Sequence, residues 1–205
     1  MDSKNFTLYK GDLPENLKFS EIIAIDTETM GLDFKRDRLC LVQISNGDNH
    51  AHLVQIIEGK KCPNLIKLLK NDKIKKIFHF ARFDIAAIQK NLNIYCENIY
   101  CTKIASKLTR TYTDKHGLKE LCKELLNIDI SKQQQSSDWG NTNLSDSQLK
   151  YAASDVLYLH DIKLKLDKLL KRENRELLAE NIFKFLGTRA YLDLNGWDHP
   201  DIFDH

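Results

Sequence analysis

Runs of apolar residues divide the chain into segments with the character of strands. Residues 22–25 form an apolar run without polar alternation, which indicates a strand that is buried on both faces and continues to about residue 27. The turn residues Asn46 to Asn49 lie between two further runs and predict a hairpin. In all, strands are expected at residues 6–9, 22–27, 39–45, 52–56 and 74–80, and a short strand or turn is expected at 98–101.

Helices are expected between and after these strands. Ser145 and Gln148 form a capping-box pattern, so we expect the longest helix of the chain to begin there. An apolar stripe continues along it at Leu149, Ala152, Val156, Leu159 and Leu166. The other expected helices lie at about 63–71, from about 81 onwards, and at 102–110, 118–127 and 173–186, with a tail at 187–205. This succession predicts an α/β fold, in which helices cover both faces of a mixed sheet.

Composition narrows the class of protein. The 205 residues fit one domain, and a net charge of +2 argues against a long electrostatic track for nucleic acid, although a short polyanion contact stays open. No segment approaches the length of a membrane span, and the N-terminus lacks the character of a signal peptide. The cysteines are odd in number and form no Cys-x-x-Cys pair, so we expect reduced cytoplasmic thiols and no zinc site: Cys40, Cys62, Cys96, Cys101 and Cys122.

Candidate chemistry begins at the end of the central strand. Asp26 and Glu28 are two residues apart, and alternation along a strand points both side chains to one side. Two adjacent carboxylates at the end of a buried strand repel each other and lose hydration, and a divalent cation relieves both problems. Two solvated acids at an exposed strand end are the alternative that this short motif alone leaves open.

Three further residues favour a metal site. Asp84 follows the run at 74–80, at a strand-to-helix junction where α/β sheets gather ligands. Tyr151 and Asp155 are four residues apart on the expected long helix, so they share one face. Considered alone, Tyr151 would be a half-buried aromatic residue and Asp155 a solvated acid on a helix. Together with Asp26 and Glu28, they indicate carboxylates beside a phenol that can hold or deprotonate a water molecule.

The motifs that contain these residues resemble those of the DEDD 3′-to-5′ exonucleases of the ribonuclease H-like superfamily. The motifs are Asp-Thr-Glu-Thr at 26–29, His-Phe-Ala-Arg-Phe-Asp at 79–84 and Tyr-x-x-x-Asp at 151–155. Lys150 stands where the histidine subgroup has its histidine, so the tyrosine subgroup is indicated. The resemblance covers about residues 20–170, is greatest to ribonuclease D, and implies a ribonuclease H-like fold with a mixed five-stranded sheet. Residues 171–205 would form a C-terminal helix and tail.

The compact group called nanoRNase C is similar in further motifs. These are Asp-Thr-Glu-Thr-Met-Gly-Leu, Thr-Asp-Lys-His-Gly-Leu-Lys, Gln-Ser-Ser-Asp-Trp-Gly and the terminal residues 201–205. The resemblance implies a 3′-5′ exoribonuclease that cleaves short single-stranded RNA (possibly DNA), notably dinucleotides, to 5′-mononucleotides, and that assembles into an octamer. Independently, Trp197, Ile202 and Phe203 stand in a tail with little room to bury them, which indicates a contact between subunits of a homo-oligomer.

The resemblance also implies a role for each acidic residue and for the tyrosine. Asp26 bridges two divalent ions, Glu28 and Asp155 complete one site, and Asp84 supports the other. Tyr151 orients the attacking water or takes its proton. Mg²⁺ or Mn²⁺ suits such an all-oxygen site better than Zn²⁺.

Three residues are candidates for contacts with a base or with the 3′-terminal nucleotide. By resemblance, Thr27 and Met30 lie beside that nucleotide, although core packing explains Met30 equally well. Trp139 either stacks on a base or anchors the long polar loop at 131–143.

Basic residues are candidates for phosphate contacts. His79 and Arg82 flank Asp84, where they either contact phosphate or stabilise the start of a helix. Arg110, Lys115 and His116 form a basic cluster that either binds the 5′ phosphate of a dinucleotide or is an exposed charged loop.

Two other functions remain open. A non-catalytic nucleic-acid-binding module would keep the fold, but all five catalytic positions carry the required residue types. Trimming of longer structured RNA or tRNA 3′ ends, as in ribonuclease D, would share the chemistry and differ in substrate.

Overall fold

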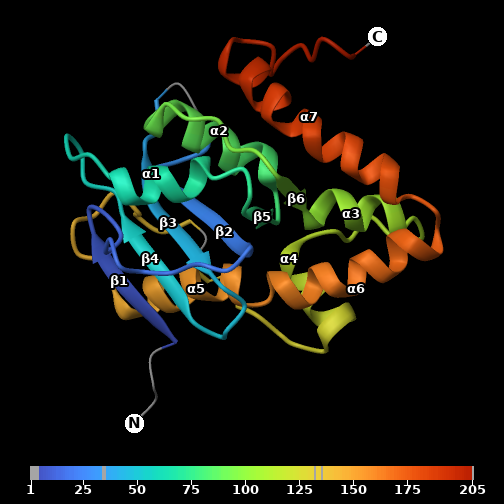
Figure 1. Ribbon diagram of the computed structural model, residues 1–205, viewed down its shortest axis with the longest axis horizontal. Helices are drawn as coiled ribbons and strands as arrows, with labels where there is room; N and C mark the ends of the chain where they lie inside the picture. Colours follow the sequence, from blue (N-terminus) through green and yellow to red (C-terminus); the bar gives the residue numbers. More distant parts are fainter. Residues whose placement is uncertain (1–4, 34–35, 132, 135, 205) are drawn as a thin grey trace.

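A six-stranded mixed sheet forms the centre of the structure, a computed structural model that describes residues 5–33, 36–131, 133–134 and 136–204 (Figure 1). The strands lie in the order β1-β4-β3-β2-β5-β6. They are β1 Phe6–Lys10, β2 Ile22–Thr29, β3 Leu39–Ser45, β4 Ala51–Gln55, β5 Lys75–Phe78 and β6 Ile99–Cys101. The α/β fold class is confirmed, but the sheet has six strands instead of five, because both short edge segments, β1 and β6, pair with a neighbour.

The central strand β2 lies between strands of opposite direction. It pairs antiparallel with β3, placing Asp26 opposite Gln43, and parallel with β5. The antiparallel pairing of β3 with β4 confirms the predicted hairpin. Every residue of β3 and β4 is buried, which fits their apolar composition and their position inside the sheet.

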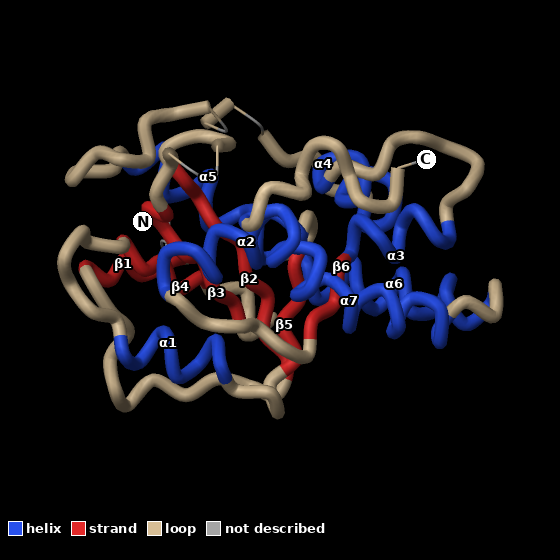
Figure 2. Tube along the Cα trace, turned by 90° about the horizontal axis from the view of Figure 1, so that it is seen from above, coloured by secondary structure: helices blue, strands red, loops and turns tan. Residues whose placement is uncertain are grey.

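Helices cover both faces of the sheet. Helix α5 packs against β1 to β4 on one face, whereas α2 packs against β2, β3, β5 and β6 on the other (Figure 1). Figures 1 and 2 place α3, α6 and α7 together at the β6 end of the sheet, where they contact one another. The helices are α1 Pro63–Lys70, α2 Ala81–Leu92, α3 Thr102–Thr109, α4 Leu118–Leu121 with a π-helical turn Cys122–Leu126, α5 Asp146–Leu157, α6 Leu159–Arg172 and α7 Glu176–Leu194.

The C-terminal helices differ from the sequence prediction. The capping box is present, because the Ser145 side chain accepts from the Gln148 backbone and the Gln148 side chain accepts from the Ser145 backbone. The helix that it starts nevertheless ends at Leu157, and a second helix begins at Leu159. The two helices pack on different partners, α5 on the sheet and α6 mainly on α3, so the chain turns between them. The longest helix is instead α7, which continues past the predicted helix end at residue 186 into the predicted tail, as far as Leu194.

None of the helices in the described part of the chain combines the length and the apolar character that crossing a membrane requires. The five cysteines are all free and buried. They contribute to the core as small apolar side chains.

Candidate active site

Three carboxylates meet at the carboxyl end of β2. Asp26 and Glu28 lie on this strand, and Asp155 lies on α5, which packs against β2. One oxygen from each carboxylate lies within 4.8 Å of those from the other two. The structure therefore brings together three of the residues predicted to bind metal.

A fourth carboxylate, Asp84, lies in the first turn of α2 and is buried. Its Oδ1 accepts a hydrogen bond of 2.7 Å from the Thr27 hydroxyl. The Asp84 charge raises the pKa of Asp26, of Glu28 and of Asp155, which places it within electrostatic range of all three. The site is thus assembled from one strand and two helices on opposite faces of the sheet.

The four carboxyl groups hold their protons more tightly than isolated acids do. Burial is the largest cause for each, and repulsion from neighbouring carboxylates adds to it for Asp26, Glu28 and Asp155. Burial and the charges of Asp155 and Asp84 raise the pKa of Glu28 to about 9. Burial raises the pKa of Asp84 and that of Asp155 to about 7, against the hydrogen bonds from Thr27 and Tyr151 respectively. The pKa of Asp26 is raised by burial and by its three acidic neighbours.

This donor set fits a hard divalent cation. All four ligand groups are carboxylates, and no described lysine or arginine is among the charges that shift their pKa values. The negative charge is therefore not offset within the described part of the chain. Oxygen-only donors of this kind favour Mg²⁺ or Mn²⁺ over Zn²⁺.

Tyr151 lies beside the acidic cluster on the same helix as Asp155. Its phenol lies near enough to the Asp155 carboxyl to hold the pKa of that group lower than burial alone would. Burial raises the pKa of Tyr151, and the charges of Asp155, Glu28 and Asp26 raise it further. Its place beside the acidic cluster suits the hydroxyl to orient a water molecule.

The three candidates for nucleotide contacts lie near this cluster but differ in exposure. Thr27 is buried with its hydroxyl bonded to Asp84, so it positions a carboxylate. Met30 is 58% exposed and lies against Gly140, which leaves its side chain open to a ligand. Trp139 is only 3% exposed, and its ring centroid lies 6.1 Å from that of Tyr151. This burial favours the alternative in which Trp139 anchors its loop.

The two basic residues of the second motif are bonded within the protein. Nδ1 of His79 hydrogen-bonds the Thr102 hydroxyl at 2.9 Å. Arg82 donates two hydrogen bonds, of 2.6 and 2.8 Å, to the buried carboxylate of Asp193 on α7. This pair ties the end of α7 to the start of α2, which favours the structural alternative for Arg82.

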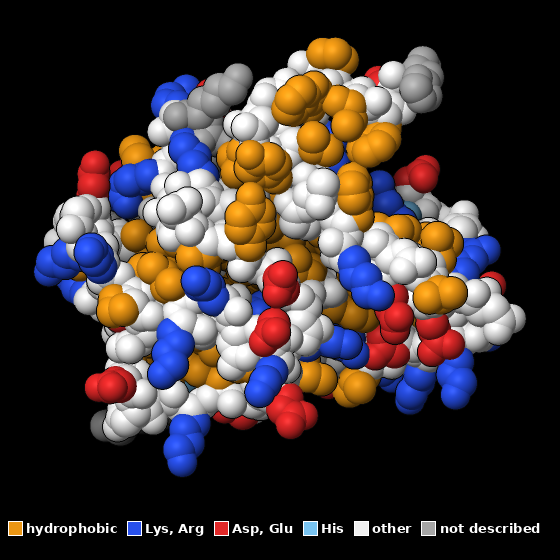
Figure 3. Space-filling view, turned by 45° about the horizontal axis from the view of Figure 1, so that its top comes forward, with side chains coloured by type: hydrophobic (Ala, Val, Ile, Leu, Met, Phe, Trp, Pro, Cys, Tyr) orange, Lys and Arg blue, Asp and Glu red, His pale blue; other side chains and the backbone are white. Residues whose placement is uncertain are grey.

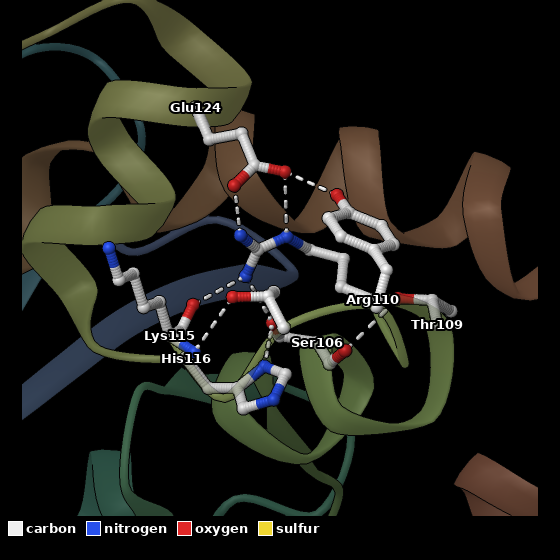
Figure 4. Close-up of polar contacts among 8 residues, drawn as sticks. Ser106, Thr109, Arg110, Lys115, His116 and Glu124 are labelled. Carbon is white, nitrogen blue, oxygen red and sulfur yellow. Dashed lines mark hydrogen bonds and ion pairs between the residues drawn. The ribbon is translucent and has the colours of Figure 1, made fainter.

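The 110–116 cluster is also mostly committed to internal contacts (Figure 4). The Arg110 side chain is fully buried and forms a two-pronged ion pair with Glu124. It also donates to the Ser106 hydroxyl at 2.9 Å and to the Lys115 carbonyl at 2.8 Å. His116 is buried, with Nδ1 2.8 Å from the same hydroxyl. The burial of Arg110 and its pairing with Glu124 do not fit phosphate binding by this residue. Lys115 is exposed, which fits the alternative of an exposed charged loop at that position.

Sequence reasoning missed the neighbour that contacts the acidic cluster from β3. Gln43 lies opposite Asp26 in the sheet, and its side-chain amide donates a 3.4 Å hydrogen bond to the Asp26 carboxylate. A signal was present, because Gln43 interrupts an otherwise apolar run from residue 39 to residue 44.

Comparison with known proteins identifies the family. A family model described as 3′-5′ exonuclease matches residues 11–171, which include all four carboxylates and Tyr151. The chain belongs to the 3′-5′ exonuclease family. Among curated proteins of this family, ribonuclease D of Bartonella henselae is 30% identical over 85% of this chain and 43% of the relative. DNA polymerase I of Aquifex aeolicus is 34% identical over 86% of this chain and 28% of the relative. The chain thus spans less than half the length of these relatives.

Solved structures include a relative of matching length. Brucella melitensis NrnC is 56% identical, with a TM-score of 0.94 over 99% of this exonuclease-family chain and 100% of the NrnC chain. NrnC has also been solved bound to pGG, at 55% identity and TM-score 0.94, and with bound Mg²⁺, at 55% identity and TM-score 0.91. The predicted resemblance to ribonuclease D and to this compact group is confirmed.

Proposed function

We propose that this chain is a metal-dependent 3′-5′ exonuclease that hydrolyses short oligoribonucleotides, dinucleotides in particular, to 5′-mononucleotides. The observation that carries the proposal is the convergence of four carboxylates beside a phenol in a fold of this family. Likeness to NrnC, solved with Mg²⁺ and with pGG, supports the class of ion and the short substrate. Residues 1–205 act as one catalytic domain.

The four carboxylates would be divided between two metal sites. Asp26, Glu28 and Asp155 would hold one divalent ion, and Asp84 together with Asp26 would hold a second. The ions supply charge neutralisation at the scissile phosphate and activate a water molecule for attack. Thr27 fixes the carboxylate of Asp84.

The phenol of Tyr151 orients the attacking water. Its contact with the Trp139 ring restricts its motion. Positioning of this kind lowers the barrier because the reacting atoms no longer have to be brought into line during the reaction.

The preference for dinucleotides draws its support from the pGG-bound relative and from the exposed Met30 beside the site. The buried Arg110 and His116 do not supply the recognition of a 5′ phosphate. Recognition of both ends is nevertheless needed, because a longer strand otherwise binds at least as well through its extra phosphates. Trimming of longer RNA 3′ ends is therefore the alternative to be tested.

The test of substrate length uses 5′-labelled RNAs of two, three, seven and twenty nucleotides with Mg²⁺, and matched DNAs. We expect the RNA dinucleotide to be hydrolysed fastest, to mononucleotides. Equal rates at every length would overturn the dinucleotide preference and favour a general trimming enzyme. Equal rates for RNA and DNA would overturn the preference for RNA.

A homo-oligomer, an octamer by resemblance, is part of the proposal. Apolar side chains gather in the upper part of the face that Figure 3 shows. In the C-terminal tail, Trp197, Ile202 and Phe203 are each about half exposed. The Phe203 ring packs edge-on against the partly exposed Phe185 of α7, with centroids 5.7 Å apart. Exposed apolar surface of this kind favours a subunit contact. Light scattering should give a multiple of the 23.8 kDa chain mass, and a monomer mass would contradict the assembly.

The free thiols fit a reducing compartment, so we place the protein in the cytoplasm. Fractionation of cells that express the tagged chain tests this placement, and recovery outside the cytoplasmic fraction would contradict it.

A further inference from the structure

Gln43 is an amide in the middle of a fully buried strand. Each of the seven residues of β3 is buried, and the residues on either side of Gln43, Val42 and Ile44, are apolar. The Gln43 side chain is 0% exposed. Packing alone favours an apolar residue at such a position.

The contacts of Gln43 point to the acidic cluster. Directly opposite residues of an antiparallel pair share a face of the sheet, so Gln43 lies on the same face as Asp26. Its Nε2 donates to Oδ2 of Asp26 at 3.4 Å. Its Oε1 is buried and has no hydrogen-bond partner among the described residues. An unpaired buried acceptor destabilises a fold, so the fold alone does not account for this amide.

We propose that Gln43 is a positioning residue, which holds the Asp26 carboxylate in the orientation that binds a divalent cation. A neutral amide orients the carboxylate without offsetting its charge, whereas a lysine or arginine at the same place would compete with the cation. Hydrogen-bonding partners of metal ligands typically act in this way. This inference rests on the proposed function, because it assigns a role toward the metal site.

The chain contains a matched control. Gln89 on α2 is also buried, donates through Nε2 to the Gly187 carbonyl at 3.3 Å, and also has an unpaired Oε1. Gly187, which accepts this hydrogen bond, lies on α7, whereas Asp26 lies on β2. Gln43→Leu therefore removes the contact to Asp26, whereas Gln89→Leu makes the same chemical change and leaves that contact in place.

The test measures Mn²⁺ affinity by electron paramagnetic resonance, without substrate, for the wild type and both variants. We expect Gln43→Leu to weaken Mn²⁺ binding by about tenfold or more, and Gln89→Leu to leave it unchanged. Thermal unfolding in EDTA provides the second readout. We expect Gln43→Leu to unfold at or above the wild-type temperature, because it removes an unpaired buried acceptor. Gln43→Met repeats the change with an unbranched side chain if the leucine variant misfolds.

Two results separate this inference from the proposed function. Asp26→Asn should abolish Mn²⁺ binding, and if it does not, the proposed metal site itself is wrong. If Asp26→Asn loses binding while Gln43→Leu changes the affinity by less than about threefold, well below the range for such partners, only the role of Gln43 is overturned. An equal loss of affinity in Gln89→Leu would also overturn it, since the effect would then be structural.

Discussion

Replacing Arg110 by methionine tests whether this residue stabilises the fold or binds substrate. Methionine keeps much of the buried apolar volume and removes every donor. The Ser106 hydroxyl and the Lys115 carbonyl then lose a charged donor, at ~1.5 kcal/mol each. Glu124 is 42% exposed and returns to water, so loss of its pair adds no more than about 1 kcal/mol. We therefore expect the free energy of unfolding to fall by ~2–4 kcal/mol.

The partner substitution gives an asymmetric result. Glu124→Ala leaves the fully buried Arg110 guanidinium without its carboxylate, which costs ~3–5 kcal/mol. It should thus destabilise at least as much as Arg110→Met, although Glu124 is the more exposed residue. The double variant should lose less stability than the two single losses together, because the residues share one interaction.

Urea unfolding of the wild type and the three variants measures these differences. For a chain of this size, each kcal/mol corresponds to about 2–4 °C in Tm, so thermal unfolding gives a parallel readout. Binding of a 5′-phosphorylated dinucleotide in Ca²⁺, at a temperature where all variants are folded, should be unchanged. The structural role would be refuted if Arg110→Met were as stable as the wild type but bound the dinucleotide about tenfold more weakly, a difference of about 1.4 kcal/mol. That result would restore the phosphate site.

Three further predictions follow from the site and from α7. Tyr151→Phe should lower kcat by about 100-fold with little change in KM, and an unchanged kcat would return Tyr151 to a packing role. In EDTA, the protonated carboxyl groups of Glu28, Asp84 and Asp155 stabilise the fold, because their pKa values are higher in the folded chain than in the unfolded one. This contribution is complete below the unfolded-state pKa values of 4.5 for Glu28 and 3.8 for the aspartates, and it is lost as the pH rises through the folded-state values of about 7 for the aspartates and about 9 for Glu28. Melting temperatures that do not fall between pH 6 and 9 would contradict this. Asp193→Ala should cost ~3 kcal/mol by urea unfolding, because it removes the buried carboxylate that pairs with Arg82 and with the buried Arg189, and a loss under about 1 kcal/mol would refute the structural role of this carboxylate.

Local patterns predicted the elements that carry the chemistry. The apolar run that ends at Asp26, the capping box at Ser145 and the four-residue spacing of Tyr151 and Asp155 each depend on a few neighbouring residues. Such signals can be recognised in the sequence because strand alternation and helix capping involve residues that are close together along the chain. The fold class and the convergence of the acids followed from them.

Properties that depend on distant partners were not predicted. Nothing local marks Arg110 as buried, since its ion pair is with Glu124, 14 residues away. The turn at Tyr158 contains no proline or glycine and reflects the different partners of α5 and α6. The extension of α7 is similarly fixed by Asp193, whose partner Arg82 is 111 residues away.

The central claim is that a metal-binding cluster of carboxylates hydrolyses short RNA from its 3′ end. The most direct measurement is the conversion of a 5′-labelled diribonucleotide to mononucleotide by the wild type and by Asp26→Asn, each with Mg²⁺ and with EDTA. We expect turnover by the wild type with Mg²⁺ alone, and less than about a tenth of that rate from the folded variant, a barrier increase above 1.4 kcal/mol. Hydrolysis in EDTA, or a variant that keeps more than about a tenth of the wild-type rate, would contradict the claim.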